Sequence, residues 1–426
     1  MPIVNTPAES TADSFVIAGR APVRSGFIGR RNAVFAAFFV SGLALASWMS
    51  RVPAVRDGLE LDTAQVGILI FGLSAGSVVG LLIAAGLLAR LGARRAMLVS
   101  ISLSATGLVF MGVGVSLVPS APFVFAALAI FGAGMGSLDV MMNVEGAAAE
   151  RAIGRTLMPL MHACFSLGTV VGALGGAAAS AWQVSVFWHL LVMAALVLGT
   201  ILVAVRFLPA AIEVDSKADA PQLTFRQRVR DGLAVWRDRK LLLIGLIVLG
   251  MTFAEGSAND WLALASVDGH GLSNTDGAIV FGVFVAAMTV GRVIGGPLLD
   301  RFGRVLVLRA CAGIGIAGLV LFILAPNTPL VFVGTILWGI GASLGFPVGM
   351  SAAADDTKNA AARVSAVAII GYGAFLVGPP VLGLLGEAWG ILNALYLVLV
   401  LMVLAGLAAP AARPAASVSN ASGRLG

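Results

Sequence analysis

Long apolar stretches separated by short polar segments recur along almost the whole chain. A helix needs about 20 apolar residues to cross a hydrocarbon core of ~30 Å. Stretches of that length lie near residues 32–52, 63–89, 96–118, 122–147, 156–180 and 185–208, and then near 241–265, 274–299, 306–325, 330–352, 364–387 and 391–411. The pattern predicts an all-α membrane protein with 12 transmembrane helices in two six-helix bundles.

The polar segments divide the chain into five parts. We expect a tail at residues 1–31, a first bundle at 32–208, a central loop at 209–240, a second bundle at 241–411 and a tail at 412–426. Within the central loop, residues 225–236 have the pattern of a short amphipathic helix that lies on the membrane surface.

The composition is that of a chain that faces lipid rather than water. Only 11% of the 426 residues are charged, whereas soluble domains carry about 25%. Most of the 27 basic residues lie in the tails, the central loop and the even-numbered connections, and basic residues mark the cytoplasmic side of membrane proteins. We expect a multi-pass protein of the bacterial inner membrane with both termini in the cytoplasm. The net charge of +6 does not indicate nucleic-acid binding, because the basic residues form no continuous face.

The sequence contains no pattern that indicates catalysis or a bound cofactor. The glycine-rich run 313–318 matches a dinucleotide-binding spacing, but it lies inside an apolar stretch with no preceding strand. Cys164 and Cys311 lie inside apolar stretches of opposite halves, which indicates core residues rather than a metal site or a disulfide. We expect no enzymatic activity, no cofactor and no metal.

The two halves repeat a short motif after their second apolar stretch. Arg90-Leu-Gly92 in the first half aligns with Arg301-Phe-Gly303 in the second. The longer segment Gly296-Pro-Leu-Leu-Asp300-Arg301-Phe-Gly303-Arg304 resembles the G-x-x-x-D-R-x-G-R signature of the major facilitator superfamily (MFS). The resemblance covers residues 30–410 and implies the MFS fold, with these residues as a conformational gate at the cytoplasmic turns. The first-half copy is degenerate, because alanines replace its glycine and aspartate.

A narrower set of residues is similar to YbjJ-type inner-membrane permeases, which are distant relatives of the proton-coupled fucose permeases. The shared positions include Trp48, Asp139, Asn143, His162, Glu255, Asn259, Asp260 and Trp261, together with Ser47, Arg51, Pro53, Arg56, Glu150 and Arg151. This resemblance implies proton-coupled movement of a small polar solute, such as a sugar or a sugar-like compound.

Ionisable side chains inside the apolar stretches are the candidates for transport chemistry. A charged group at membrane depth costs roughly 2.5–3.5 kcal/mol, so it persists mainly beside a cavity or a partner. Glu255 and Asp139 are the leading candidates for proton or solute binding, and Asn259 and Asn143 follow each of them by one helical turn. The alternative is that each acid only pairs with an arginine or caps a helix break.

Four further residues complete the candidate set. Asp260 follows Asn259 directly and is a further proton or solute candidate. His162 is a candidate proton relay, because imidazole titrates near neutral pH, although a purely structural hydrogen bond would also explain it. Trp48 and Trp261 are candidates for stacking against a sugar ring, but tryptophans in membrane proteins more often serve packing.

These observations predict a secondary active transporter that works by alternating access, functions as a monomer and has a small-molecule solute, protons and the lipid bilayer as its partners. One alternative is proton-driven efflux of amphipathic compounds. Another is a membrane sensor that transports nothing and signals through the central loop.

Overall fold

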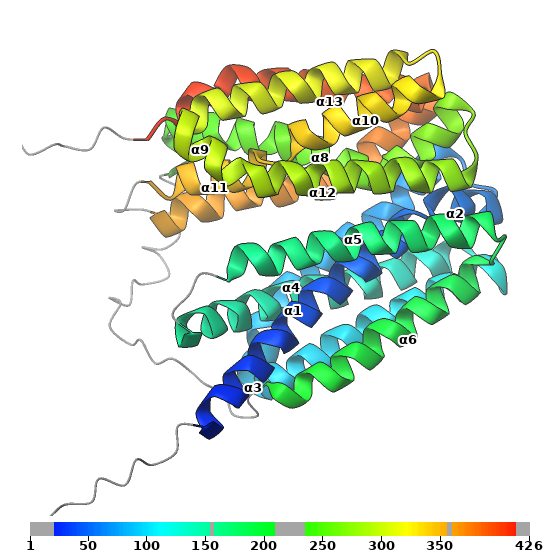
Figure 1. Ribbon diagram of the computed structural model, residues 1–426. Coiled ribbons are helices and arrows are strands. Elements are labelled where there is room, and N and C mark those ends of the chain that lie inside the picture. The colour runs from blue at the N-terminus through cyan, green and yellow to red at the C-terminus, as the bar shows by residue number, and fades with distance from the viewer. Residues whose placement is uncertain (1–20, 154–156, 209–234, 356–359, 415–426) are drawn as a thin grey trace, which may run out of the picture.

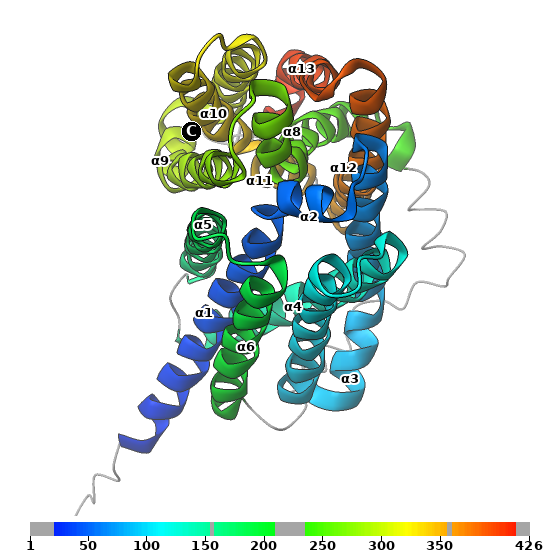
Figure 2. The same cartoon turned by 90° about the vertical axis from the view of Figure 1, so that its right-hand side faces the viewer.

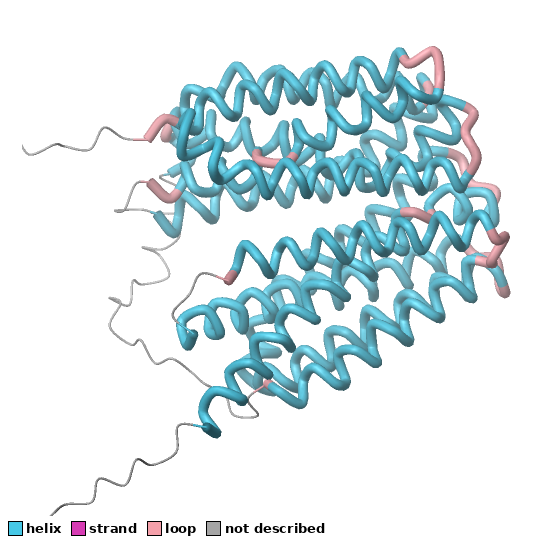
Figure 3. Tube along the Cα trace, in the orientation of Figure 1, coloured by secondary structure: helices cyan, strands magenta, loops and turns pink. Residues whose placement is uncertain are grey.

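The computed structural model describes residues 21–153, 157–208, 235–355 and 360–414. Every regular element within these ranges is a helix, and the connections between helices are short (Figure 3). The amphipathic helix predicted at 225–236 lies outside the described residues except for its last two positions, which belong to a short turn of 3₁₀-helix, η2 (Val235–Arg237). Most of the predicted tails and of the central loop also lie outside.

The helices form two bundles that follow one another in the chain (Figure 1). The first contains α1 (Ala21–Met49), α2 (Val52–Leu59), α3 (Thr63–Ser116), α4 (Ala121–Ile153), α5 (Met158–Ala181), α6 (Val186–Ala204) and η1 (Val205–Phe207). The second contains α8 (Arg239–His270), α9 (Asn274–Leu324), α10 (Thr328–Ala342), α11 (Gly345–Ala353), α12 (Ala360–Trp389), α13 (Ile391–Ala408) and η3 (Ala409–Ala412).

Two of these helices are each long enough to cross a membrane twice. Among the described residues, 10 helical segments have the length and composition of a membrane span, and α3 and α9 contain 54 and 51 residues. A straight helix of that size would measure ~80 Å, more than twice the hydrocarbon thickness. Both reverse at one glycine, so dividing them there gives the predicted 12 crossings.

The two reversals occur at the glycines of the repeated motif. Gly92 has φ 72° and Gly303 has φ 75°, in a region of backbone conformation that side chains with a Cβ rarely adopt. The repeat identified in the sequence therefore corresponds to the same turn in each bundle.

The stretch predicted at 330–352 forms two helices, α10 and α11, instead of one continuous helix. Pro347 lies in the first turn of α11 and has no backbone N–H to donate to the carbonyl of Ser343. The helix breaks at Ser343 and Leu344, and the Ser343 carbonyl is left for a side-chain donor. This break positions part of the central site described below.

All helices run roughly between two ends of the molecule. We call the end at which α1 begins and α13 ends the tail end, and the opposite end, where loops join α8 to α9 and α12 to α13, the far end (Figure 1). Seen from the far end, the bundles lie one above the other, and α2 lies at their junction (Figure 2).

The two bundles are hydrogen-bonded to each other only toward the far end, as far as the described residues show. One contact is an ion pair, between Arg56 and Asp268 at 2.5 Å. Two are hydrogen bonds to carboxylates, from the Asn274 amide to Asp57 and from the Thr63 N–H to Glu387, each at 3.0 Å. In the fourth, the Ser74 hydroxyl donates to the Phe375 carbonyl at 2.9 Å. Toward the tail end, the ribbons of the two bundles diverge (Figure 1). The structure is therefore closed at the far end.

At the tail end, α8 is tied to α12 of the same bundle. The Asp238 carboxylate caps α8 by accepting hydrogen bonds from the N–H groups of Lys240 and Leu241 at 2.8 and 3.3 Å, and it also pairs with Arg363. The hydrogen bond from Arg363, aided by the two backbone donors, lowers the pKa of Asp238 below its ordinary value of 3.8. A lowered pKa means that folding is stabilised by the ionised form.

Asp238→Asn is expected to lower the melting temperature at neutral pH, because it removes the charged partner of Arg363. The contribution is fully present above the ordinary pKa of 3.8 and is lost as the pH falls through the lower pKa of the folded state. Thermal unfolding of detergent-solubilised protein at several pH values measures this difference. Asp300→Asn, which changes an exposed carboxyl without a described partner, is the control, and equal melting curves for the two variants at neutral pH would contradict the expectation.

Candidate functional site

An ion pair in the second bundle lies near the middle of its helices. The guanidinium of Arg292 in α9 donates to the carboxylate of Glu255 in α8 at 2.7 Å, and its Nε donates to the Ser343 carbonyl at 3.4 Å. That carbonyl is the one left without a helical donor by Pro347. The pair is partly shielded, since the Glu255 side chain is 15% exposed and the Arg292 side chain 32%.

The first bundle contributes a carboxyl and an amide from one face of α4. The Asn143 amide donates to the Asp139 carbonyl at 2.8 Å and to its carboxylate at 3.2 Å. The spacing of four residues therefore places the two groups together, as expected. Both residues are half-buried.

Side chains of the two bundles approach each other in this central region. His162 of α5, whose ring contacts that of Phe38 at 5.0 Å, lies close enough to Arg292 for an electrostatic interaction. Tyr372 of α12 is likewise near Asp139. We call Asp139, Asn143, His162, Glu255, Arg292 and Tyr372 the central polar set.

Two members of the central polar set were not among the candidates from the sequence. Arg292 is an arginine inside the apolar stretch 274–299, and this feature could have revealed it because such residues rarely lack a partner. Tyr372 carries no comparable signal, because a lone tyrosine in an apolar stretch is common at membrane interfaces.

Asn259 and Asp260 follow Glu255 in α8 but differ in their surroundings. Asn259 is half-buried, and it has no hydrogen-bond partner among the described residues. Asp260 is only 8% exposed and lines a cavity of about 10 Å³ between α8 and α12. It is therefore separate from the Glu255–Arg292 pair.

The two candidate stacking residues are enclosed by their own bundles. Trp48 is 1% exposed and Trp261 is 0% exposed, so in this conformation neither ring presents an open face to the space between the bundles. Trp261 instead lines the cavity of Asp260.

The predicted gate motif makes its contacts within the second bundle. Arg304 pairs with Asp355 at 2.6 Å and donates to the Ser351 hydroxyl at 2.9 Å, which ties the turn of α9 to α11. Arg301 lies over the ring of Phe302, with 5.2 Å from the guanidinium to the ring centre. Gly296, Asp300 and Arg90 are exposed, and in the described chain neither charged group forms an ion pair. Within the described ranges, the motif thus joins no residues of opposite bundles while the far end is closed.

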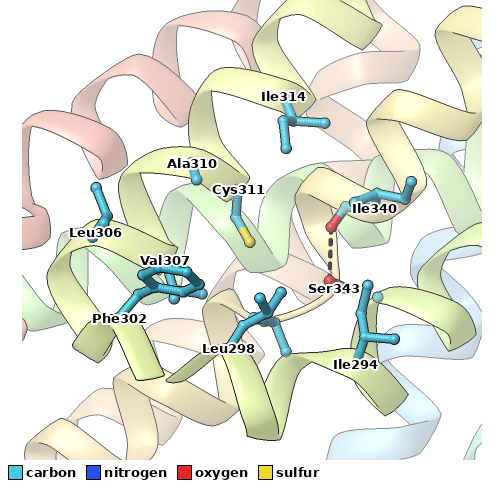
Figure 4. A pocket seen from close by; sticks show the side chains of 12 residues that line it. Ile294, Leu298, Phe302, Leu306, Val307, Ala310, Cys311, Ile314, Ile340 and Ser343 are labelled. Carbon is cyan, nitrogen blue, oxygen red and sulfur yellow. Dashed lines mark hydrogen bonds between the residues drawn. The ribbon is translucent and has the colours of Figure 1, made fainter. Parts of the chain in front are cut away.

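A larger pocket, which no member of the central polar set lines, lies between the two arms of α9 and the end of α10 (Figure 4). Its volume is about 380 Å³, and its lining is almost wholly apolar, including Leu298, Phe302 and Cys311. The hydroxyl of Ser343, the exception, donates to the Ile340 carbonyl. Such a lining suits hydrocarbon rather than a polar solute. The described residues contain no cluster of three or more histidine, cysteine or acidic side chains that would hold a metal.

Two helical bundles with polar side chains near the middle of their long apolar helices are typical of secondary transporters. Residues 33–375 and 263–424 of the chain match the Major Facilitator Superfamily. An uncharacterized transporter of Sinorhizobium fredii is 34% identical over 362 residues, which cover 83% of this chain and 90% of that protein. An uncharacterized MFS-type transporter of Yersinia pestis is 30% identical over 354 residues, covering 82% and 87%. The protein belongs to the major facilitator superfamily and is a multi-pass membrane transporter, which confirms the predicted family and fold.

Solved transporters share the fold at low sequence identity. A mutant of the nucleoside transporter NupG superimposes with a TM-score of 0.73 at 16% identity, covering 91% of this chain and 99% of that chain. The transporter FucP in its outward conformation gives 0.61 at 18% identity, covering 92% and 100%.

Proposed function

We propose that the protein moves a small, hydroxyl-rich polar solute across the membrane by alternating access, coupled to protons. The observation that supports this most is the central polar set, in which His162 of the first bundle lies near Arg292 of the second and Tyr372 of the second lies near Asp139 of the first. Hydroxyl groups can donate to the carboxylates of Asp139 and Glu255 and accept from Asn143 and Arg292. A solute bound there would contact both bundles at once.

The names of structural relatives are consistent with this solute class. One relative is called a nucleoside transporter and another a fucose:proton symporter, and both names refer to molecules with several hydroxyl groups. Recognition by hydroxyl groups also agrees with the chemistry of the central polar set, which has both donors and acceptors. A wholly hydrophobic substrate would leave these groups desolvated and unpaired.

The direction in which the site opens depends on the membrane orientation. We infer from the distribution of basic residues that the tail end faces the cytoplasm of the bacterial inner membrane. The structure, which is closed at the far end, would then be the state that exchanges solute with the cytoplasm. The protein would work as a monomer, since each chain carries a central polar set of its own.

The proposal is tested with purified protein in proteoliposomes, challenged with sugars, polyols, nucleosides, organic acids and cationic drugs. A solute-evoked transient current from one polar class, lost in Asp139→Asn, is the expected result. Glu60→Gln is the matched control, because Glu60 is an exposed carboxyl at the far end without a described partner.

Two results would replace the proposal with the alternatives. A response only to amphipathic cations, driven by an opposing proton gradient, would identify an efflux pump. Solute binding measured by calorimetry without any flux would identify a sensor.

A further inference from the structure

We propose that Asp260 is the proton-binding carboxyl of this transporter and that its protonation holds α12 against α3, which keeps the far end closed. The inference rests on the proposed function in one respect, namely that transport is coupled to protons. It assigns the proton to a place apart from the central polar set, where Glu255 and Asp139 would be left to bind the solute.

Asp260 differs from Glu255, Glu145 and Asp139 in having no side-chain partner among the described residues. Glu255 pairs with Arg292, Glu145 accepts from Arg30 at 2.9 Å, and Asp139 accepts from Asn143. The side chain of Asp260 makes no hydrogen bond and no ion pair with any described residue, although it is only 8% exposed. An ionised carboxylate without a partner in such a place costs several kcal/mol, whereas a protonated carboxyl does not carry this cost.

The cavity beside Asp260 is small and has the polar groups that a neutral carboxyl can use. Its volume of about 10 Å³ corresponds to the space that roughly one water molecule needs. Ser257 and Trp261 line it with Asp260, and the buried indole N–H of Trp261 has no hydrogen-bond partner in the part of the chain that the structure describes. The Ser257 hydroxyl donates to the Phe253 carbonyl at 2.6 Å, so its oxygen remains free to accept. The hydration shell of a carboxylate, by contrast, would not fit.

Among the described residues that line this cavity, no second titratable group faces the carboxyl. The cavity is lined by α8 and α12 alone, and Asp260 is its only charged or titratable residue. Glu255 lies five residues earlier in α8, which places it ~140° around the helix, and it is held by Arg292. On α12, Tyr372 lies near Asp139 and Glu387 accepts from Thr63 at the far end. The charge at this place therefore depends on Asp260 itself.

The wall of the cavity that α12 provides is also the contact between the two bundles. Pro379 has no N–H to donate to the Phe375 carbonyl, and the Ser74 hydroxyl of α3 donates to that carbonyl instead, at 2.9 Å. Phe375 and Pro379 both line the cavity. The backbone of Pro379 also approaches α3 so closely that a Cβ added to Gly67 would lie 2.7 Å from its carbonyl oxygen.

These contacts couple the charge of one side chain to the position of a helix. When Asp260 is protonated, the cavity can stay small and α12 remains against α3. When the proton leaves, the carboxylate requires water, and the cavity must widen to admit it. The segment from Phe375 to Pro379 is the wall that can move, because its helical hydrogen bonding is already interrupted. Deprotonation thus favours opening of the far end.

The proposal is tested by measuring the far-end separation of the bundles against pH, without any solute. Spin labels are attached to Leu117→Cys and Trp389→Cys, two exposed far-end positions in opposite bundles, with Cys164 and Cys311 replaced by alanine. We expect the distance between the labels to increase as the pH rises, with the ratio of closed to open molecules changing by ~5–150-fold, the usual range of coupling between two sites.

Asp260→Asn, which has the shape of the neutral acid, is expected to keep the short distance at every pH. Glu255→Gln is expected to keep the pH dependence while losing solute binding. Ser74→Ala is expected to shift the populations toward the long distance at every pH. A pH dependence that survives in Asp260→Asn, or that disappears in Glu255→Gln, would overturn the assignment.

The outcomes separate this inference from the proposed function. If the distance depends on pH through Asp260 but no solute is transported, the proton site stands and the transport proposal fails. If a polar solute is transported with a proton and Asp260→Asn retains that coupled current, transport stands and this inference fails.

Discussion

Arg292→Ala is expected to abolish solute binding and to destabilise the protein by about 2–4 kcal/mol. Removing one member of a buried ion pair costs ~3–5 kcal/mol because the other charge is left unpaired. The expected value is slightly lower here because the Arg292 side chain is 32% exposed. The mutation also leaves the Ser343 carbonyl, which Arg292 caps at the break between α10 and α11, without its donor. Thermal unfolding in detergent and calorimetric titration with the transported solute measure the two effects.

A matched control for this arginine lies in the same helix. Arg309 is exposed in the second arm of α9 and forms no ion pair within the described chain, so Arg309→Ala should leave both stability and solute binding nearly unchanged. The double variant Glu255→Gln with Arg292→Gln should recover most of the stability, since no unpaired charge remains, but not the binding. Equal stability of Arg292→Ala and Arg309→Ala would show that the pair contributes nothing to folding.

Gly76→Val is expected to prevent normal folding of the first bundle. α3 and α4 approach so closely at this position that a Cβ on Gly76 would lie 2.0 Å from the carbonyl oxygen of Ala129. The obstacle is backbone, which cannot rotate away as a side chain can, so the two helices would have to separate. Overpacked cores usually lose ~1–3 kcal/mol and occasionally more, and we expect this substitution to be at the upper end or beyond it.

Gly86→Val in the same helix is the control, because a Cβ added to Gly86 meets nothing within 4 Å. The fraction of monodisperse protein after solubilisation, followed by size-exclusion chromatography and thermal unfolding, compares the two variants. If Gly76→Val were as well folded as Gly86→Val, the close packing of α3 on α4 would not be essential.

The sequence was sufficient to predict the spans and the two bundles because apolar length is a local property. Gly92 and Gly303 were found in the same way, since the repeat places a glycine where the chain must turn with positive φ. The break between α10 and α11 is not predicted by apolar length, because residues 330–352 are long enough for one continuous helix. The structure differs because Pro347 has no N–H to donate to the carbonyl of Ser343.

The candidate site was only partly predictable, because partners on different helices are not encoded by spacing along one helix. The spacing of Asp139 and Asn143 predicts a shared helix face, and the structure adds a hydrogen bond between the two side chains. The same spacing places Asn259 one turn after Glu255, yet Glu255 pairs with Arg292 and Asn259 has no hydrogen-bond partner among the described residues. Which acid receives an arginine depends on how α8 packs against α9 and α12, and that packing emerges only from the complete fold.

The interior prolines are distributed unevenly between two bundles that otherwise repeat each other. Among the described helices, Pro297 in α9 and Pro379 and Pro380 in α12 interrupt regular hydrogen bonding, and all of them belong to the second bundle. We therefore expect the second bundle to bend more readily than the first, although the two share one architecture. An antibody fragment that binds only the first bundle is then expected to recognise more states of the cycle than one that binds α11 and α12.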